Sequence, residues 1–309
     1  ILGWWALPLY LLGFGLAWLS AFFAGIRSDL IALNFALLVP IFAWAIYRFR
    51  LRFWLASLML ALHLAWAFLL DTWGWWQYPA YAWQRFAPLT LGTLLAALWL
   101  QGYRGEKSPL INFAGWSHIL YSFVLVDILL SQFSSLGGEA AGALVSLINA
   151  LIFGIFASAW RSRGCAYFST VLGAVALAQW LQSLTGPIQG LPVAYAYLAL
   201  GYAVAGYLLT AAQRRSRGEA EEISMPAWLL VWESPLQISG LVLSFGVLLL
   251  TTILGIDLAG WFARALLGIP FREIVDLTTV QMVVRIGSIL GLLYLTNSLV
   301  YRHLRVGYL

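Results

Sequence analysis

The stretch FWLASLMLALHLAWAFLL, residues 53–70, decides the fold class, because it continues for about five helical turns without an acidic or strongly basic side chain. Other apolar stretches follow along the chain, separated by charged residues, proline or glycine. A bilayer core about 30 Å thick requires about 20 apolar residues per helix. The sequence therefore predicts an all-α, polytopic membrane bundle of about ten transmembrane helices, at residues 4–26, 30–47, 53–70, 86–101, 109–131, 140–160, 165–184, 191–212, 234–256 and 279–301.

The composition excludes several classes of protein. Of the 309 residues, 62% are hydrophobic and 9% are charged, whereas soluble domains contain about 25% charged residues. A soluble enzyme, a disordered chain and a nucleic-acid-binding domain are therefore excluded. The long unbroken apolar runs also differ from the alternating segments of about ten residues that build a transmembrane barrel. Cys165 is the single cysteine, so the chain can form neither an intramolecular disulfide nor a thiolate metal site.

Positive charges gather in alternate loops of the predicted bundle. They follow the second, fourth, sixth, eighth and tenth predicted helices, at Arg48, Arg50, Arg52, Arg104, Lys107, Arg161, Arg163, Arg214, Arg215, Arg217, Arg302 and Arg305. The opposite loops hold only Arg27, Arg85, Arg264 and Arg272. Because short cytoplasmic loops are enriched in lysine and arginine, we expect both ends of this segment to be cytoplasmic. The location that we expect is a bacterial plasma membrane.

Two short elements recur and indicate tandem, parallel repeats of four helices. Tyr47-Arg48-Phe49-Arg50 corresponds to Trp160-Arg161-Ser162-Arg163, 113 residues later, and Tyr301-Arg302 continues the series. A unit with an even number of helices returns the chain to the side of the membrane from which it started. The predicted division is a partial repeat at 1–52, repeat units at 53–164 and 165–305, and the start of a further unit at 306–309, as in a segment of a longer protein. The alternative is chance, because arginine at a cytoplasmic helix end followed by an aromatic residue is common in polytopic proteins.

Two histidines are candidates for cofactor binding. His63 is about ten residues into its predicted helix and His118 about nine, and both helices begin on the cytoplasmic side. At a rise of about 1.5 Å per residue, both imidazoles are predicted near mid-membrane. Equal depth would allow them to ligate one haem or to bind a pigment. The favoured alternative is that each imidazole hydrogen-bonds a neighbouring helix.

Four other polar residues are candidates for a substrate or gating site. Asp127 and Arg285 are predicted at similar depth near the external side, where an ion pair would offset the cost of burying either charge. The alternative is that the pair fixes helix packing, or that Arg285 extends to the membrane surface. Asn149 and Gln179 are further candidates for substrate contact, although amides in membrane helices usually bridge helices.

The function favoured by these patterns is a transporter or channel-like protein with a site between helical repeats. A structural or scaffold subunit of a larger assembly is the alternative, and a haem- or pigment-binding subunit acting through His63 and His118 is the third. The sequence lacks the HExxH, GxSxG and P-loop patterns, so we expect neither catalytic residues nor a metal site. We expect no cofactor unless the third alternative holds. The expected partners are the lipid bilayer and other membrane subunits or further repeats, and no nucleic acid.

Overall fold

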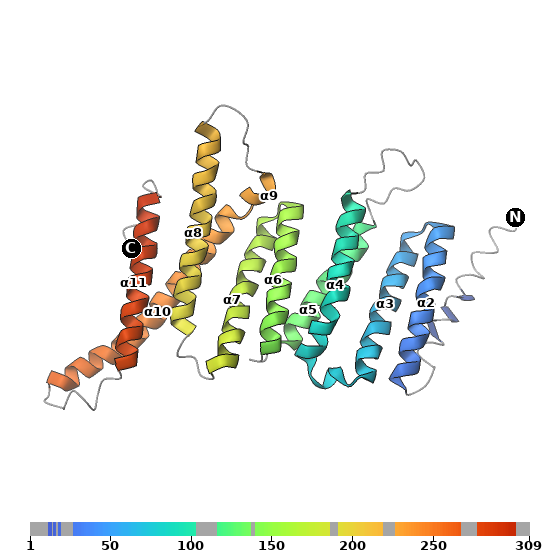
Figure 1. Cartoon of the computed structure of the whole chain (residues 1–309), viewed down its shortest axis with the longest axis horizontal. Helices are drawn as coiled ribbons and strands as arrows, with labels where there is room; N and C mark the ends of the chain where they lie inside the picture. Colours follow the sequence, from blue (N-terminus) through green and yellow to red (C-terminus); the bar gives the residue numbers. More distant parts are fainter. Residues whose placement is uncertain are drawn as a thin grey trace. The chain divides into compact units, whose positions relative to one another are not determined.

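The computed structural model describes residues 12, 13, 15, 16, 18, 19, 27–102, 116–136, 140–185, 191–218, 226–266 and 277–300. Within these residues every regular element is a helix, as the sequence predicts (Figure 1). The helices long and apolar enough to cross a membrane are α2 (Ser28–Phe49), α3 (Arg52–Thr72), α5 (Ser117–Ser134), α6 (Ala140–Trp160), α7 (Arg163–Thr185), α8 (Leu191–Gly218) and α10 (Glu233–Leu266). These seven helices are compatible with a multi-pass membrane protein.

The predicted count of ten spans is not confirmed. The first predicted span, residues 4–26, lies largely outside the described residues. The stretches at 86–101 and 279–301 do coincide with helices, α4 (Pro79–Gly102) and α11 (Leu277–Val300), but neither is among the seven. Helix α4 carries glutamine, arginine, threonine and glycine along its length, which lowers its mean hydropathy.

The chain divides into two compact units, of which the first is Ile1–Leu136. In this unit α2 packs along α3, α4 packs along α5, and α5 also contacts α3. Stacked aromatic rings fill the contact between α2 and α3. Phe42 stacks on Trp54, with ring centroids 6.0 Å apart, and both side chains are fully buried. A short 3-10 helix, η1 (Trp75–Gln77), joins α3 to α4.

The turn from α2 to α3 depends on one left-handed residue, Arg50, with φ 54°. Its N–H donates to the carbonyl oxygen of Ile46 at 2.9 Å, the next residue is extended, and α3 begins at Arg52. The turn from α6 to α7 has the same form, with Arg161 at φ 51° and α7 beginning at Arg163. The two turns are 111 residues apart, from Arg50 to Arg161, two fewer than the offset predicted for the repeat. The division into tandem repeats stays a prediction.

The second unit, Gly137–Leu309, is built from two helix pairs and an added helix. Helix α6 packs along α7, α8 packs along α10, and α11 packs on α8; the short helix α9 (Ala227–Leu230) precedes α10. Gly240 of α10 lies against the backbone of α8, because a Cβ atom at this position would be 2.9 Å from the carbonyl oxygen of Ala199. The absence of a side chain there lets the two helices approach closely.

Candidate functional site

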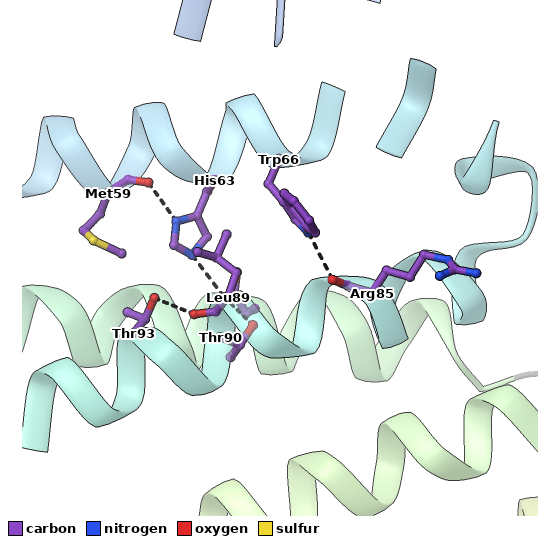
Figure 2. A network of polar contacts seen from close by, with 8 residues as sticks. Met59, His63, Trp66, Arg85, Leu89, Thr90 and Thr93 are labelled. Atoms are coloured by element: carbon purple, nitrogen blue, oxygen red, sulfur yellow. Dashed lines mark hydrogen bonds and ion pairs between the residues drawn. The ribbon is translucent and has the colours of Figure 1, made fainter. Parts of the chain in front are cut away.

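A buried polar cluster joins three helices of the first unit. His63 of α3, Thr90 of α4 and Asp127 of α5 each lie near the middle of their helix. The Nε2 atom of His63 is 3.2 Å from Asp127 Oδ2, and the Thr90 hydroxyl donates to the same oxygen at 2.8 Å. The three residues are 7%, 5% and 5% exposed. Figure 2 shows His63 and Thr90 extending toward one another from α3 and α4. We call these three residues the His–Asp cluster.

The sequence pattern of each helix places these side chains inward. In α5, Asp127 belongs to a buried stripe with Leu120, Val124 and Ser131, spaced three or four residues apart. Thr90 continues the buried face of α4 that includes Phe86. The polar groups are therefore part of the packed core of the unit.

Aromatic rings enclose the imidazole of His63. The ring centroids of Phe123 and Phe86 lie 5.0 Å and 5.7 Å from that of His63. Such an apolar surrounding strengthens any electrostatic interaction inside it, and it makes an unpaired charge costly. A charge on either side chain would therefore be costly here without the other beside it.

Helix α4 is irregular next to the cluster. Pro88 lacks a backbone N–H, so it cannot donate to the carbonyl oxygen of Gln84 one turn earlier. The hydroxyl of Thr93 donates back to the carbonyl oxygen of Leu89 at 2.8 Å, a bond that favours bending of a helix. Both features flank Thr90, as Figure 2 shows for Leu89 and Thr93. The segment that carries Thr90 therefore lacks one backbone hydrogen bond and has one side-chain bond to the backbone, within a continuous helix.

The two ring nitrogens of His63 both face oxygen atoms that accept hydrogen bonds. Nδ1 lies 2.7 Å from the carbonyl oxygen of Met59, one turn earlier in α3, and Nε2 faces Asp127. A neutral imidazole has one N–H group and one acceptor nitrogen, so it can donate to only one of these oxygens. If His63 is neutral and Asp127 is ionised, one ring nitrogen carries no hydrogen, and its lone pair faces the lone pairs of an oxygen atom. That contact is unfavourable.

One additional proton removes this conflict. If it is on His63, both N–H groups donate and Asp127 is a carboxylate; if it is on Asp127, the acid O–H donates to Nε2 and Nδ1–H donates to Met59. Thr90 can donate to Oδ2 in both states. The pair with this proton is neutral overall, which reduces the cost of burying it. Within the described residues no further titratable side chain bonds to His63 or Asp127. The cluster therefore has the geometry of a proton-binding site.

The two predicted cofactor ligands, His63 and His118, lie at different levels of the bundle. His118 is exposed in the first described turn of α5, nine residues before Asp127. At a rise of about 1.5 Å per residue this separation is about 13 Å along the helix. Because His63 is level with Asp127, the two imidazoles do not share the depth expected for bis-imidazole ligation. Both nitrogens of His63 are also engaged with protein oxygens.

The other predicted site residues lie in the second unit. Arg285 is an exposed residue of α11, and its pairing with Asp127 stays a prediction. Asn149 of α6 is 3% exposed. Gln179 of α7 accepts a hydrogen bond at 2.6 Å from the hydroxyl of Ser146 on α6. Gln179 therefore bridges two helices, as amides in membrane helices commonly do.

Sequence reasoning singled out His63 and Asp127 but did not connect them. It placed the start of α5 at residue 109, whereas the described helix begins at Ser117, so Asp127 lies near its middle rather than near its end. It also placed the start of α4 at residue 86 instead of Pro79, which hid the central position of Thr90. The available signal was Pro88 two residues before a threonine, because proline in a membrane helix frees a carbonyl group for other partners.

No known protein family, curated protein or solved structure matches the chain. Among the described residues no group of three or more histidine, cysteine, aspartate or glutamate side chains could hold a metal ion. The chemistry of the His–Asp cluster is therefore the basis from which a function can be inferred.

Proposed function

We propose that the protein is a membrane transporter that couples the movement of a solute to protonation of the His–Asp cluster. The observation that carries this proposal is the contact of 3.2 Å between His63 and Asp127, buried between helices that could cross a membrane. Ionisable residues within a bilayer are costly to bury, and where they occur they commonly mark ion pathways or proton relays. A relay also requires a group that changes charge near neutral pH, which imidazole does.

The proline within α4 supports transport over a purely structural role. Transporters commonly form their binding sites near proline or glycine in a membrane helix. Pro88 lies inside α4, which stays helical from Pro79 to Gly102, and Thr90, which binds the Asp127 carboxylate, is two residues away. A carboxylate accepts a stronger bond than a protonated acid does, so a change of the proton on Asp127 would change the strength with which Thr90, beside Pro88, is held. The cluster thus offers a physical link between proton binding and helix movement.

The substitution Asp127→Asn tests the proton site, because it removes the need for the additional proton. One amide N–H of asparagine can donate to Nε2 while Nδ1–H still donates to Met59, and the second amide N–H can donate to the Thr90 hydroxyl oxygen. We expect the folded wild-type protein to release about one proton per chain more than Asp127→Asn when the solution is made alkaline, because only the wild-type cluster holds the additional proton. An indicator dye in weakly buffered detergent solution measures this difference.

Glu233→Gln is the matched control, because Glu233 is a carboxylate that accepts a bond from Thr210 at 2.7 Å and lies in the second unit, outside the His–Asp cluster. We expect its proton release to equal that of the wild type. Equal release by the wild type and Asp127→Asn would contradict the proton site.

In liposomes with an imposed pH gradient and an entrapped pH dye, we expect an added solute to dissipate the gradient with the wild type only. Tetraphenylphosphonium and glucose are the probes, because neither carries a proton across a bare bilayer, and no response to either of them would contradict coupled transport.

A scaffold function is the second candidate, favoured by the packing of the second unit. Gly240 brings α10 against the backbone of α8, and the hydroxyls of Thr170 and Ser239 bond to each other at 2.7 Å between α7 and α10. These are contacts that fix helices in place. A protein whose Asp127→Asn variant binds protons as the wild type does would fit this function instead.

A further inference from the structure

The first unit contains a cavity of about 770 Å³ between α2, α3 and α4. Cavities that bind small molecules typically measure about 300 to 1,000 Å³ and have mainly apolar walls with few polar groups. This cavity has that character, since its lining is alanine, leucine, tryptophan and proline apart from Asp29. Asp29 is the one charged residue among the described lining residues. The cavity is therefore suited to a largely apolar molecule that carries a charge.

The cavity lies directly beside the His–Asp cluster. Its lining includes Leu62 and Leu89, which precede His63 and Thr90 in the chain. Trp66 forms part of the wall and donates its indole N–H to the carbonyl oxygen of Arg85 at 3.1 Å, which links α3 to α4 next to Pro88 (Figure 2). A molecule in the cavity would touch the same segments of α3 and α4 that hold the cluster.

The charged groups at the Asp29 end of the cavity favour a cation. Arg27 binds Asp29 through two contacts, of 2.6 Å and 3.1 Å, and Ser28 hydrogen-bonds to the carboxylate of Asp71. Two carboxylates therefore lie at this end, and the guanidinium group of Arg27 contacts Asp29, whereas Asp71 accepts from a neutral hydroxyl. The side chain of Arg27 is 74% exposed, so a ligand cation can replace it at Asp29 with little desolvation. The indole face of Trp66 offers a further favourable surface for positive charge.

We infer that the cavity binds a bulky, largely apolar organic cation, with its apolar groups between Leu62, Trp66 and Leu89 and its positive charge near Asp29. Such a molecule is the substrate class if the proposed transport function holds. Binding itself does not require transport, so the two proposals can fail separately.

Equilibrium binding to the purified full chain in detergent tests the inference. Radiolabelled tetraphenylphosphonium is the probe, and tetraphenylborate is its control, because the two ions have nearly the same shape and opposite charge. We expect saturable binding of the cation and none of the anion. Asp29→Asn should weaken binding by about fivefold, as suits a partly exposed charge pair. Arg27→Ala should tighten binding by about twofold, because it removes the competing guanidinium. The substitution does not weaken the N-cap of α2, because the Arg27 side chain makes no capping hydrogen bond.

A pair of tryptophan substitutions on α2 locates the binding. Ala36 lines the cavity and is exposed, so Ala36→Trp should fill the cavity and abolish saturable binding without disturbing the core. Leu37→Trp, the matched control, is 56% exposed and outside the lining, and it should bind as the wild type does.

Two outcomes would overturn the inference. Equal binding of the cation and the anion would indicate a groove for lipid chains, and unchanged binding by Ala36→Trp would place the ligand elsewhere. If tetraphenylphosphonium binds as expected while Asp127→Asn releases protons as the wild type does, the cation site stands and the coupled transport fails. If the proton release differs but neither ion binds, the cation site fails and the proton site stands.

Discussion

Arg50 and Arg161 hold left-handed backbone conformations, which residues with a Cβ atom adopt at a cost of about 1 kcal/mol or more. Glycine is the usual residue at such helix ends, because it has no Cβ atom to clash with the following carbonyl group. Arginine at both turns is therefore unfavourable for the backbone. The positive charge near a predicted cytoplasmic surface provides a compensating role, since it favours the correct orientation of the hairpin in the membrane.

Replacing either arginine with glycine should stabilise the folded protein. We expect Arg50→Gly and Arg161→Gly each to raise the free energy of unfolding by about 1 kcal/mol, because the left-handed strain is removed. Arg48→Gly is the control: Arg48 lies within α2, where glycine should lower stability by about 1 kcal/mol. Unfolding of the purified variants by sodium dodecyl sulfate, followed by circular dichroism, measures these changes. A loss of stability in Arg50→Gly would show that contacts of its side chain outweigh the strain.

Single residues show what the sequence could and could not predict about the site. His63 and Asp127 are identifiable because ionisable groups are rare in apolar stretches. Their pairing is not identifiable, because it depends on where each helix begins and on which faces meet. Helix α4 begins seven residues before the predicted start, which shifts a side chain by about 10 Å relative to the helix end. The predicted start of α5, residue 109, lies outside the described residues. The carbonyl oxygen of Met59, which decides the proton arrangement, has no sequence signature.

At the scale of helices, the crossing of α8 and α10 depends on Gly240. A Cβ atom there would be 2.9 Å from the Ala199 carbonyl oxygen and 3.1 Å from the Ala203 nitrogen, both of them backbone atoms that cannot move independently. Only a shift of one helix could relieve such contacts. The close approach of these two helices is therefore specific to glycine.

Gly240→Ala should destabilise the second unit by about 1 to 3 kcal/mol, the range for overpacking a core. Gly246→Ala on the same helix is the matched control, because a Cβ atom at Gly246 would meet no atom within 4 Å. Alanine there should leave stability unchanged or raise it by up to about 1 kcal/mol. Thermal unfolding in detergent compares the two variants. Equal effects of the two substitutions would argue against close packing at Gly240.

Helix packing motifs were predicted less well than helices themselves. The GxxxG pattern of Gly287 and Gly291 suggests a close helix contact, but within the described residues no atom lies within 4 Å of a Cβ placed at either glycine. The repeat motif matched at an offset of 113 residues, whereas the turns of the two hairpins correspond at 111, as Phe49-Arg50-Leu51-Arg52 and Trp160-Arg161-Ser162-Arg163. Apolar sequences use few residue types, so short matches between them fix register poorly.

At the scale of the whole molecule, the alternation of arginine-rich loops predicts which surface each hairpin turn faces. Cys165, the single cysteine, is half-buried two residues into α7 after Arg163. We expect a membrane-impermeant maleimide to label it in inverted vesicles and not in intact cells. Cys165→Ser with Gln77→Cys in the exposed turn after α3 should give the reverse result. Labelling of both cysteines from one side would contradict the predicted orientation.

The existence of the helices could be predicted because the hydropathy of a segment is a local property. Apolar stretches of about 20 residues have few alternatives to the helix in a bilayer. The division into two compact units, after Leu136, is not predictable in the same way. It depends on which helix faces pack together, and helices that are apolar on every side give a weak amphipathic signal.

The His–Asp cluster also bears on biosynthesis. An aspartate at the centre of a helix raises the cost of translocon insertion by about 3 kcal/mol, and α5 carries Asp127 near its middle. Ribosomes synthesise chains from the N-terminus, so α3 with His63 and α4 with Thr90 precede α5. Both hydrogen-bonding partners of Asp127 are therefore already synthesised when α5 reaches the bilayer. Their hydrogen bonds can lower the free-energy cost of inserting its carboxyl group.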